Sequence, residues 1–289
     1  MHEGGHAAHY ANIDQDSPFC SQERPPFSVA LAETQAMTLE EFGRDAGWMA
    51  RYAKSRDGEV VPWPLVEKSM RSAQPYSVFG LRSMLAVSYL EKALYETPEG
   101  QLTPARVIAL GDEVEARIQG GPSSRPVLTV PHILADESSA YYHGYTLASM
   151  AVHQNRAAFR RLLGAHDLTD RPEVGALLSG GYWKAGNTVP FLTMVERVTS
   201  APLTADAWVA ELETPIDEAV AREKADYDAA LLKGARYATG DPAVERKLDV
   251  RVELVHGALT LGDSETDGGL GPAMAKFAKF VRDTYFRKN

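Results

Sequence analysis

The chain has 289 residues, of which 44% are hydrophobic and 24% charged, and its formal net charge is -9. This composition is typical of a folded globular protein with enough apolar material for a core. The negative charge, without any run of Lys or Arg, argues against nucleic acid as a partner. No stretch approaches the ~18 consecutive apolar residues of a membrane span, so we expect no membrane partner and a cytoplasmic location. Cys20 is the only cysteine, which excludes intrachain disulfides and cysteine-based zinc sites.

The first predicted element is a helix that carries His2-Glu3-Gly4-Gly5-His6, an HExxH motif. Histidines at positions i and i+4 lie on one helical face, so both rings can bind one zinc ion while Glu3 reaches the water bound to it. The two glycines each cost roughly 1 kcal/mol of helix propensity against alanine, so we expect this helix to be weak. A metal-site helix usually has turns before its first ligand. We therefore expect a catalytic domain over 1–289 that is truncated at its N-terminus.

An HExxH site needs a third protein ligand, which leaves one open position for water. Asn12 stands where the third histidine of a metzincin would be, so that class is excluded. Glu33, early in the next helical stretch, is the predicted third ligand. Glu40 lies seven residues further on the same face and suits a hydrogen bond to a zinc-bound imidazole.

The identity of the third ligand and the role of the histidines have alternative interpretations. The carboxylates that compete with Glu33 as the third ligand are Glu23, Glu40 and Glu41. His9 shares the face of the motif but lies one turn further on, so we expect a neighbour of the metal site rather than a ligand. The alternative to a metal site is an ordinary pair of histidines on a surface helix.

The rest of the chain is helical in pattern almost throughout. Predicted helices cover Leu31–Lys54, Leu65–Arg71, Tyr76–Glu96 (apolar and expected to be buried), a segment N-capped by Thr103 that ends before Gly120, Ser138–Leu163, Thr204–Lys233 with a break at Pro215, and Ala273–Arg287. Residues Pro122–Pro131 are predicted as a loop, and Asp249–Leu261 alternates in part like a strand. The sequence thus predicts a mainly α fold with at most a small β-hairpin near the C-terminus.

Three segments together resemble the M3 family of zinc oligopeptidases, which includes the thimet oligopeptidases and oligoendopeptidase F. They are the motif segment through His9, Ser28–Glu33, and Ala140–Tyr145. The similarity covers roughly residues 2–220 and only the C-terminal half of the family's usual length. It implies a multi-helix zincin-type catalytic domain, Zn²⁺ as cofactor, short peptides as substrates, and a missing N-terminal half that supplies the other wall of the substrate channel.

The resemblance also implies roles for single residues. It gives His2, His6 and Glu33 as zinc ligands, Glu3 as general base, Glu40 as a second carboxylate, Tyr142 and Tyr145 as oxyanion and substrate donors, and His132 as a contact to the substrate backbone. Because His143 is inserted before Gly144, either Tyr141 or Tyr142 is the first tyrosine of the pair, and Tyr141 is kept as a substrate-binding candidate. The alternative is that these tyrosines are helix aromatics in a core.

The predicted function is a zinc-dependent endopeptidase that hydrolyses short peptides. Glu3 would take a proton from the attacking water and pass it to the leaving amine. A tyrosine hydroxyl would donate to the oxyanion. The competing prediction is a non-catalytic, N-terminally truncated zinc-binding fragment whose apolar helix faces are exposed. A zinc hydrolase of another amide class is a third possibility on the same ligand set.

Overall fold

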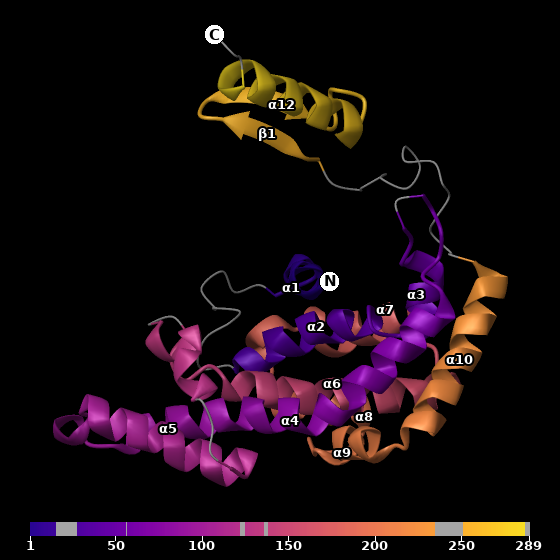
Figure 1. The fold of residues 1–289 in the computed structure, drawn as a ribbon. Coiled ribbons are helices and arrows are strands. Elements are labelled where there is room, and N and C mark those ends of the chain that lie inside the picture. The colour runs from indigo at the N-terminus through magenta and orange to yellow at the C-terminus, as the bar shows by residue number, and fades with distance from the viewer. Residues whose placement is uncertain (16–27, 56, 122–124, 136–137, 235–250, 287–289) are drawn as a thin grey trace. The chain divides into compact units, whose positions relative to one another are not determined.

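The computed structural model describes residues 1–15, 28–55, 57–121, 125–135, 138–234 and 251–286. The chain divides into two compact units, Met1–Gly234 and Ala235–Asn289. Within the described residues the first unit is helical apart from one isolated β-bridge, and the second holds a two-stranded antiparallel hairpin and a helix (Figure 1). The predicted fold class, mainly α with one small β-hairpin near the C-terminus, is therefore confirmed. All the residues of the candidate site lie in the first unit.

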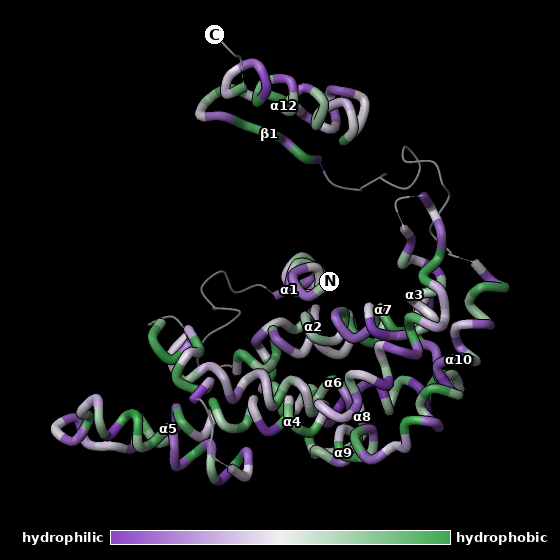
Figure 2. Tube along the Cα trace, in the orientation of Figure 1, coloured by the Kyte–Doolittle hydropathy of each residue, from purple (hydrophilic) through white to green (hydrophobic). Residues whose placement is uncertain are grey.

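The first unit contains the helices labelled α1 to α10 in Figure 1. Their bounds are α1 His2–Ala11, α2 Val29–Phe42, α3 Ala46–Tyr52, α4 Trp63–Glu96, α5 Pro104–Gln119, α6 His143–Leu163, α7 Pro172–Leu178, α8 Phe191–Thr199, α9 Asp206–Glu213 and α10 Ile216–Lys233. Most are amphipathic, and hydrophobic and hydrophilic residues alternate along their traces (Figure 2). None of the helices in the described part of the chain is both long and apolar enough to cross a membrane.

A central core fixes α2, which packs against α1 on one side and α6 on another. Buried residues from α2, α6, α7, the turn Ser179–Trp183 and α8 form this core, and they include Leu31, Phe159, Leu178, Tyr182 and Val195. A fully buried Leu or Phe side chain contributes about 1.5–3 kcal/mol, so the core provides a rigid base for anything carried by α2 and α6. There are two smaller apolar clusters. One lies between α4 and α5, and the other lies between α3, α4 and α10.

Two predicted helix boundaries are wrong in the first half of the chain. The helix predicted over Leu31–Lys54 is broken between α2 and α3, where the Ala46 amide donates to Glu223 of α10 at 2.9 Å. This contact is long-range, so no local pattern could reveal the break. The two helices predicted over 65–71 and 76–96 are one continuous α4 with Pro75 inside it. Residues around Pro75 are exposed, so water can hydrate the carbonyl that loses its hydrogen bond.

The predicted burial of Tyr76–Glu96 is correct only in part. Ala86, Val87 and Leu90 are buried, but Tyr76 and Phe79 are 70% and 57% exposed. The N-terminal half of this apolar segment therefore has no covering element among the described residues of its unit.

Other helix ends follow the sequence signals closely. Thr103 caps α5 by accepting the Arg106 amide at 3.2 Å, and Gly120 ends that helix in the left-handed region. Pro215 separates α9 from α10, as expected. The start of α6 is misplaced by the sequence, because Ala140 adopts a positive φ of 52° and the helix begins only at His143. Of the loop predicted over 122–131, the described part is wound into short 3₁₀ turns.

The second unit is a small ββα arrangement. Strands β1 (Glu253–His256) and β2 (Leu259–Asp263) pair antiparallel, and α12 (Leu270–Tyr285) packs on β2. A Cβ at Gly262 would lie 2.4 Å from the Ala273 carbonyl oxygen, which explains why glycine stands at this contact. The strand predicted over 249–261 is thus a hairpin, with 249–250 outside the described residues. The last helix begins three residues earlier than expected.

Candidate metal centre

The HExxH helix α1 lies unusually close to α2, and Gly5 makes this possible. A Cβ at Gly5 would fall 2.5 Å from Ala36 Cα and 2.6 Å from the Gln35 carbonyl oxygen, both backbone atoms. Gly4 has nothing within 4 Å of a built Cβ. The sequence interpretation of both glycines as weak points in the helix is therefore incomplete, because Gly5 is the contact that lets the two helices approach.

This close approach brings His2, His6 and Glu33 together. Each contributes one potential ligand atom, and the three atoms lie within 4.8 Å of one another. His2 Nε2 and His6 Nε2 lie 3.4 and 3.9 Å from Glu33 Oε2. Tetrahedral zinc with bonds of about 2.0–2.1 Å separates neighbouring ligand atoms by about 3.3 Å. The three side chains are thus spaced to accept one zinc ion with little movement.

The hydrogen bonds around these atoms also fit a metal. Glu33 is buried, and its Oε2 accepts no hydrogen bond, although a buried carboxylate oxygen without a partner is costly. Glu40 Oε2 lies 3.1 Å from His2 Nδ1. The Nδ1 proton can be donated to this carboxylate, which leaves the lone pair of Nε2 directed toward Glu33 Oε2. Two electron-rich atoms facing each other in this way are stabilised by a cation.

Glu40 is itself held by Arg44. The Arg44 guanidinium donates to Glu40 Oε1 at 2.8 Å and to Glu41 Oε1 at 2.7 Å. The structure thus places Glu40 beside His2, where the sequence predicted a carboxylate that orients an imidazole. Arg44 was not singled out from the sequence, although its i+4 spacing from Glu40 is a usable signal.

A cluster of four rings covers the other side of Glu33. It consists of His132, Tyr141, Tyr142 and Tyr145, with ring centroids 5.2–6.0 Å apart in the contacting pairs. The start of α6 reaches this position because Gly144 sits against Val29 at the start of α2, where a Cβ would lie 2.4 Å from Val29 Cγ2. The sequence-predicted histidine and tyrosines are therefore brought beside the ligand set.

The two candidate tyrosines of the shifted register differ clearly. The Tyr141 hydroxyl donates to Glu33 Oε1 at 2.6 Å, so this phenol touches a candidate ligand. Tyr142 donates its backbone amide to Glu91 Oε2 at 3.1 Å, and its ring packs on the apolar cluster between α4 and α5. Tyr141 is thus the tyrosine of this pair that contacts the ligand set, whereas the Tyr142 ring belongs to the apolar cluster between α4 and α5.

Tyr145 lies next to His132, with 3.3 Å between its hydroxyl and His132 Nε2. Burial, helped by the negative charges of Glu33 and Glu3, raises the pKa of Tyr145 to about 12. Its hydroxyl therefore keeps its proton and remains a hydrogen-bond donor at neutral pH. Glu3, one residue after His2, is exposed on α1.

The competing ligands fall outside the three-residue group. Glu41 pairs with Arg44, and Glu23 lies outside the described residues. His9 is fully buried, and its burial, with a contribution from nearby His6, lowers its pKa to about 4. It is a neutral neighbour of the ligand set and not a member of it.

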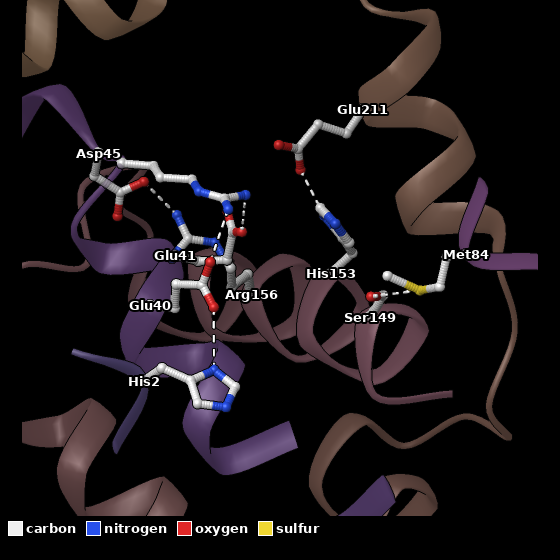
Figure 3. Close-up of polar contacts among 10 residues, drawn as sticks. His2, Glu40, Glu41, Asp45, Met84, Ser149, His153, Arg156 and Glu211 are labelled. Atoms are coloured by element: carbon white, nitrogen blue, oxygen red, sulfur yellow. Dashed lines mark hydrogen bonds and ion pairs between the residues drawn. The ribbon is translucent and has the colours of Figure 1, made fainter. Parts of the chain in front are cut away.

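A cavity of about 660 Å³ opens beside the ligand set. His2 and Tyr145 line one part of it, and residues of α2, α4, α6, α9 and α10 line the rest. Further along α6, the cavity wall contains the ion pair of Arg156 with Asp45 (2.5 Å) and the contact of His153 with Glu211 (2.9 Å) (Figure 3). None of these four residues was singled out from the sequence.

A signal for this wall was present in the sequence. The α6 residues that line the cavity include Tyr145, Ser149, His153, Arg156 and Arg160, which recur every three or four positions. This spacing places them on one face of a helix. A polar stripe of this kind, starting at a candidate catalytic tyrosine, indicates a cavity-facing surface.

A second group with metal-ligand atoms, His166, Glu223 and Asp226, lies on the first unit as well. His166 Nδ1 pairs with Asp226, and Glu223 accepts the Ala46 amide. These contacts tie α10 to the loop after α6 and to the start of α3.

Comparisons with known proteins support the fold alone. No protein-family model matches the chain, and no curated protein is detectably similar to it. Among solved structures, the chain is similar to the crystal structure of BsuCP, with a TM-score of 0.55 and 18% sequence identity. The match covers 78% of this chain and 47% of that protein, so the chain spans about half of its length.

Proposed function

We propose that this chain is a zinc-dependent peptidase domain of the M3 type that hydrolyses short peptides. The observation that carries the proposal is the spacing of His2, His6 and Glu33, with 3.4 and 3.9 Å between the histidine Nε2 atoms and Glu33 Oε2. An ordinary surface pair of histidines would not require a buried carboxylate oxygen that accepts no hydrogen bond.

The proposed chemistry divides among the residues already described. Zinc, when bound, supplies Lewis-acid activation of water and of the scissile carbonyl. Glu3 accepts the proton of the attacking water and delivers it to the leaving amine. The Tyr145 hydroxyl donates to the oxyanion, and His132 holds the Tyr145 ring and contacts the substrate backbone. Glu40 orients the His2 imidazole.

Tyr141 has a role of its own in the proposal. Its hydroxyl donates to Glu33 Oε1, which leaves Oε2 to face the histidines. A carboxylate fixed in this way loses less conformational freedom when a metal binds. Tyr141 therefore supports the ligand set, and contact with the substrate falls to Tyr145, which lines the cavity.

A second candidate function is a zinc-binding domain without peptidase activity. It is favoured by the exposure of Tyr76, Val78 and Phe79, which are 70%, 49% and 57% exposed on α4, one of the helices that bound the cavity. Apolar residues grouped in this way often mark a surface that another segment covers. If substrate binding requires that cover, the chain binds zinc without turnover.

Metal removal tests the peptidase proposal. We expect the purified chain to hydrolyse a quenched-fluorescent peptide of about ten residues, and hydrolysis to stop after dialysis against a zinc chelator, because the bound water is no longer activated. Addition of about one equivalent of zinc should restore the rate, and addition of Mg²⁺ should not, because Mg²⁺ prefers oxygen ligands. Hydrolysis that survives chelation contradicts the proposal. Stoichiometric zinc without hydrolysis supports the second candidate.

A further inference from the structure

We propose that His153, held by Glu211 and Trp208, forms a remote peptide-binding subsite in the cavity beside the metal centre. The proposal rests on the proposed peptidase function and extends it, because it assigns a length requirement to the substrate. Peptides that extend three or four residues from the scissile bond gain a main-chain hydrogen bond to His153, and shorter peptides do not.

The first step of the argument is that His153 is fixed in place. Its Nδ1 lies 2.9 Å from Glu211 Oε2, and its ring stacks on Trp208 with 5.4 Å between centroids and 9° between planes. Burial raises the pKa of Glu211, but the hydrogen bond and charge of His153, with two arginines nearby, outweigh burial and lower it to about 2. Glu211 therefore stays ionised at neutral pH and accepts a hydrogen bond from Nδ1–H.

The second step is that the other ring nitrogen is left available. With Nδ1 donating to Glu211, Nε2 is the ring atom left for a ligand: it accepts a hydrogen bond when the imidazole is neutral and donates one when the imidazole carries a second proton. Among the described residues Nε2 has no hydrogen-bond partner, and His153 lines the cavity. A ring nitrogen held beside a cavity by a carboxylate and an aromatic ring suits the N–H or C=O groups of a peptide main chain.

The third step is the distance from the metal centre. Tyr145 and His153 both lie on α6 and both line this cavity, eight residues apart. With a rise of 1.5 Å per residue, this separation is roughly 12 Å along the helix. An extended peptide advances about 3.3 Å per residue, so a substrate that lies along α6 reaches His153 three or four residues from its scissile bond.

The neighbouring wall combines paired charges with apolar side chains. Arg156 is paired with Asp45 (Figure 3), Arg44 is paired with Glu40 and Glu41, and Arg160 donates to the His166 carbonyl. Methionines at 37, 70 and 84 line the same cavity and offer adaptable apolar contacts to side chains of varied shape.

The test compares peptides of two lengths on the intact chain. His153→Ala is expected to lower kcat/KM about tenfold, the equivalent of one hydrogen bond, for a peptide with five residues on each side of the scissile bond. The loss should lie in KM, with kcat nearly unchanged. For a peptide with two residues on each side, the variant should match the wild-type protein. His256→Ala, the same substitution in the second unit, is the control and should leave kcat/KM unchanged for both peptides.

A second variant and a binding measurement distinguish an effect on substrate binding from an effect on the catalytic step. Glu211→Gln leaves the imidazole present but releases its orientation, so we expect a smaller loss, about threefold, again for the long peptide alone. In a Glu3→Gln background, the Kd of the long peptide by calorimetry should rise about tenfold with His153→Ala. An equal loss with both peptide lengths, or no change with the long one, overturns the subsite. Absence of wild-type turnover, with the Kd difference intact, overturns the proposed function and leaves the subsite standing.

Discussion

Replacement of Glu3 by glutamine should lower peptide turnover about 10³-fold while zinc stays bound. A general base typically contributes a factor of ~10²–10⁴ to the rate. Glutamine preserves the size and hydrogen-bonding reach of Glu3 but cannot accept a proton at neutral pH. Glu3 is exposed on α1 and is not one of the three grouped ligand residues, so its replacement leaves the ligand set intact. The measurement is kcat/KM on a quenched-fluorescent peptide together with zinc content.

The control for this substitution is Glu99→Gln, an exposed glutamate in the 3₁₀ turn that follows α4. It removes the same charge far along the chain from the ligand set, so both turnover and zinc content should stay at the wild-type level. Turnover by Glu3→Gln within tenfold of the wild-type rate would remove Glu3 from the mechanism. Loss of zinc in that variant would instead give Glu3 a part in metal binding.

Gly5→Ala should remove zinc binding and lower the free energy of unfolding by about 3 kcal/mol. This is the upper end of the usual destabilisation when an extra methyl group is forced into a packed contact. The added methyl group would fall 2.5 Å from Ala36 Cα and 2.6 Å from the Gln35 carbonyl oxygen, so α1 must move away from α2. His2 and His6 would move with it, away from Glu33. Chemical denaturation and zinc content measure the two effects.

Gly4→Ala is the matched control, because it adds the same group one residue away, where nothing lies within 4 Å. The better helix propensity of alanine should stabilise α1 by about 0.5–1 kcal/mol and leave zinc binding intact. Similar behaviour of the two variants would mean that the close approach of α1 and α2 does not determine the metal site.

Much of the fold could be predicted from local signals. Thr103 with Pro104 marks the start of α5, and Pro215 separates α9 from α10, because caps and prolines act on their own neighbours in the chain. The break between α2 and α3 could not be predicted, since it depends on Glu223, which lies 177 residues from Ala46. The continuous α4 through Pro75 was also missed, because a proline is tolerated where solvent can replace the lost hydrogen bond.

The candidate site follows the same division between local and long-range information. The i, i+4 spacing predicts that His2 and His6 share a face, and the structure brings both beside Glu33. The register of the tyrosines could not be decided from spacing, because the positive φ of Ala140 shifts the start of α6 and turns Tyr141 toward Glu33. The carboxylate partner of His153 comes from α9, 58 residues along the chain, so only the stripe on α6 was visible in the sequence.

The most direct test of the central claim is the number of zinc ions per chain in the purified protein, measured by elemental analysis beside a His6→Ala variant. His6 Nε2 lies 3.9 Å from Glu33 Oε2, so its removal takes away one of three ligands. We expect close to one zinc per chain in the wild-type protein and almost none in the variant, with both folded by circular dichroism. A folded wild-type protein without zinc, or a variant that retains it, would contradict a metal centre formed by His2, His6 and Glu33.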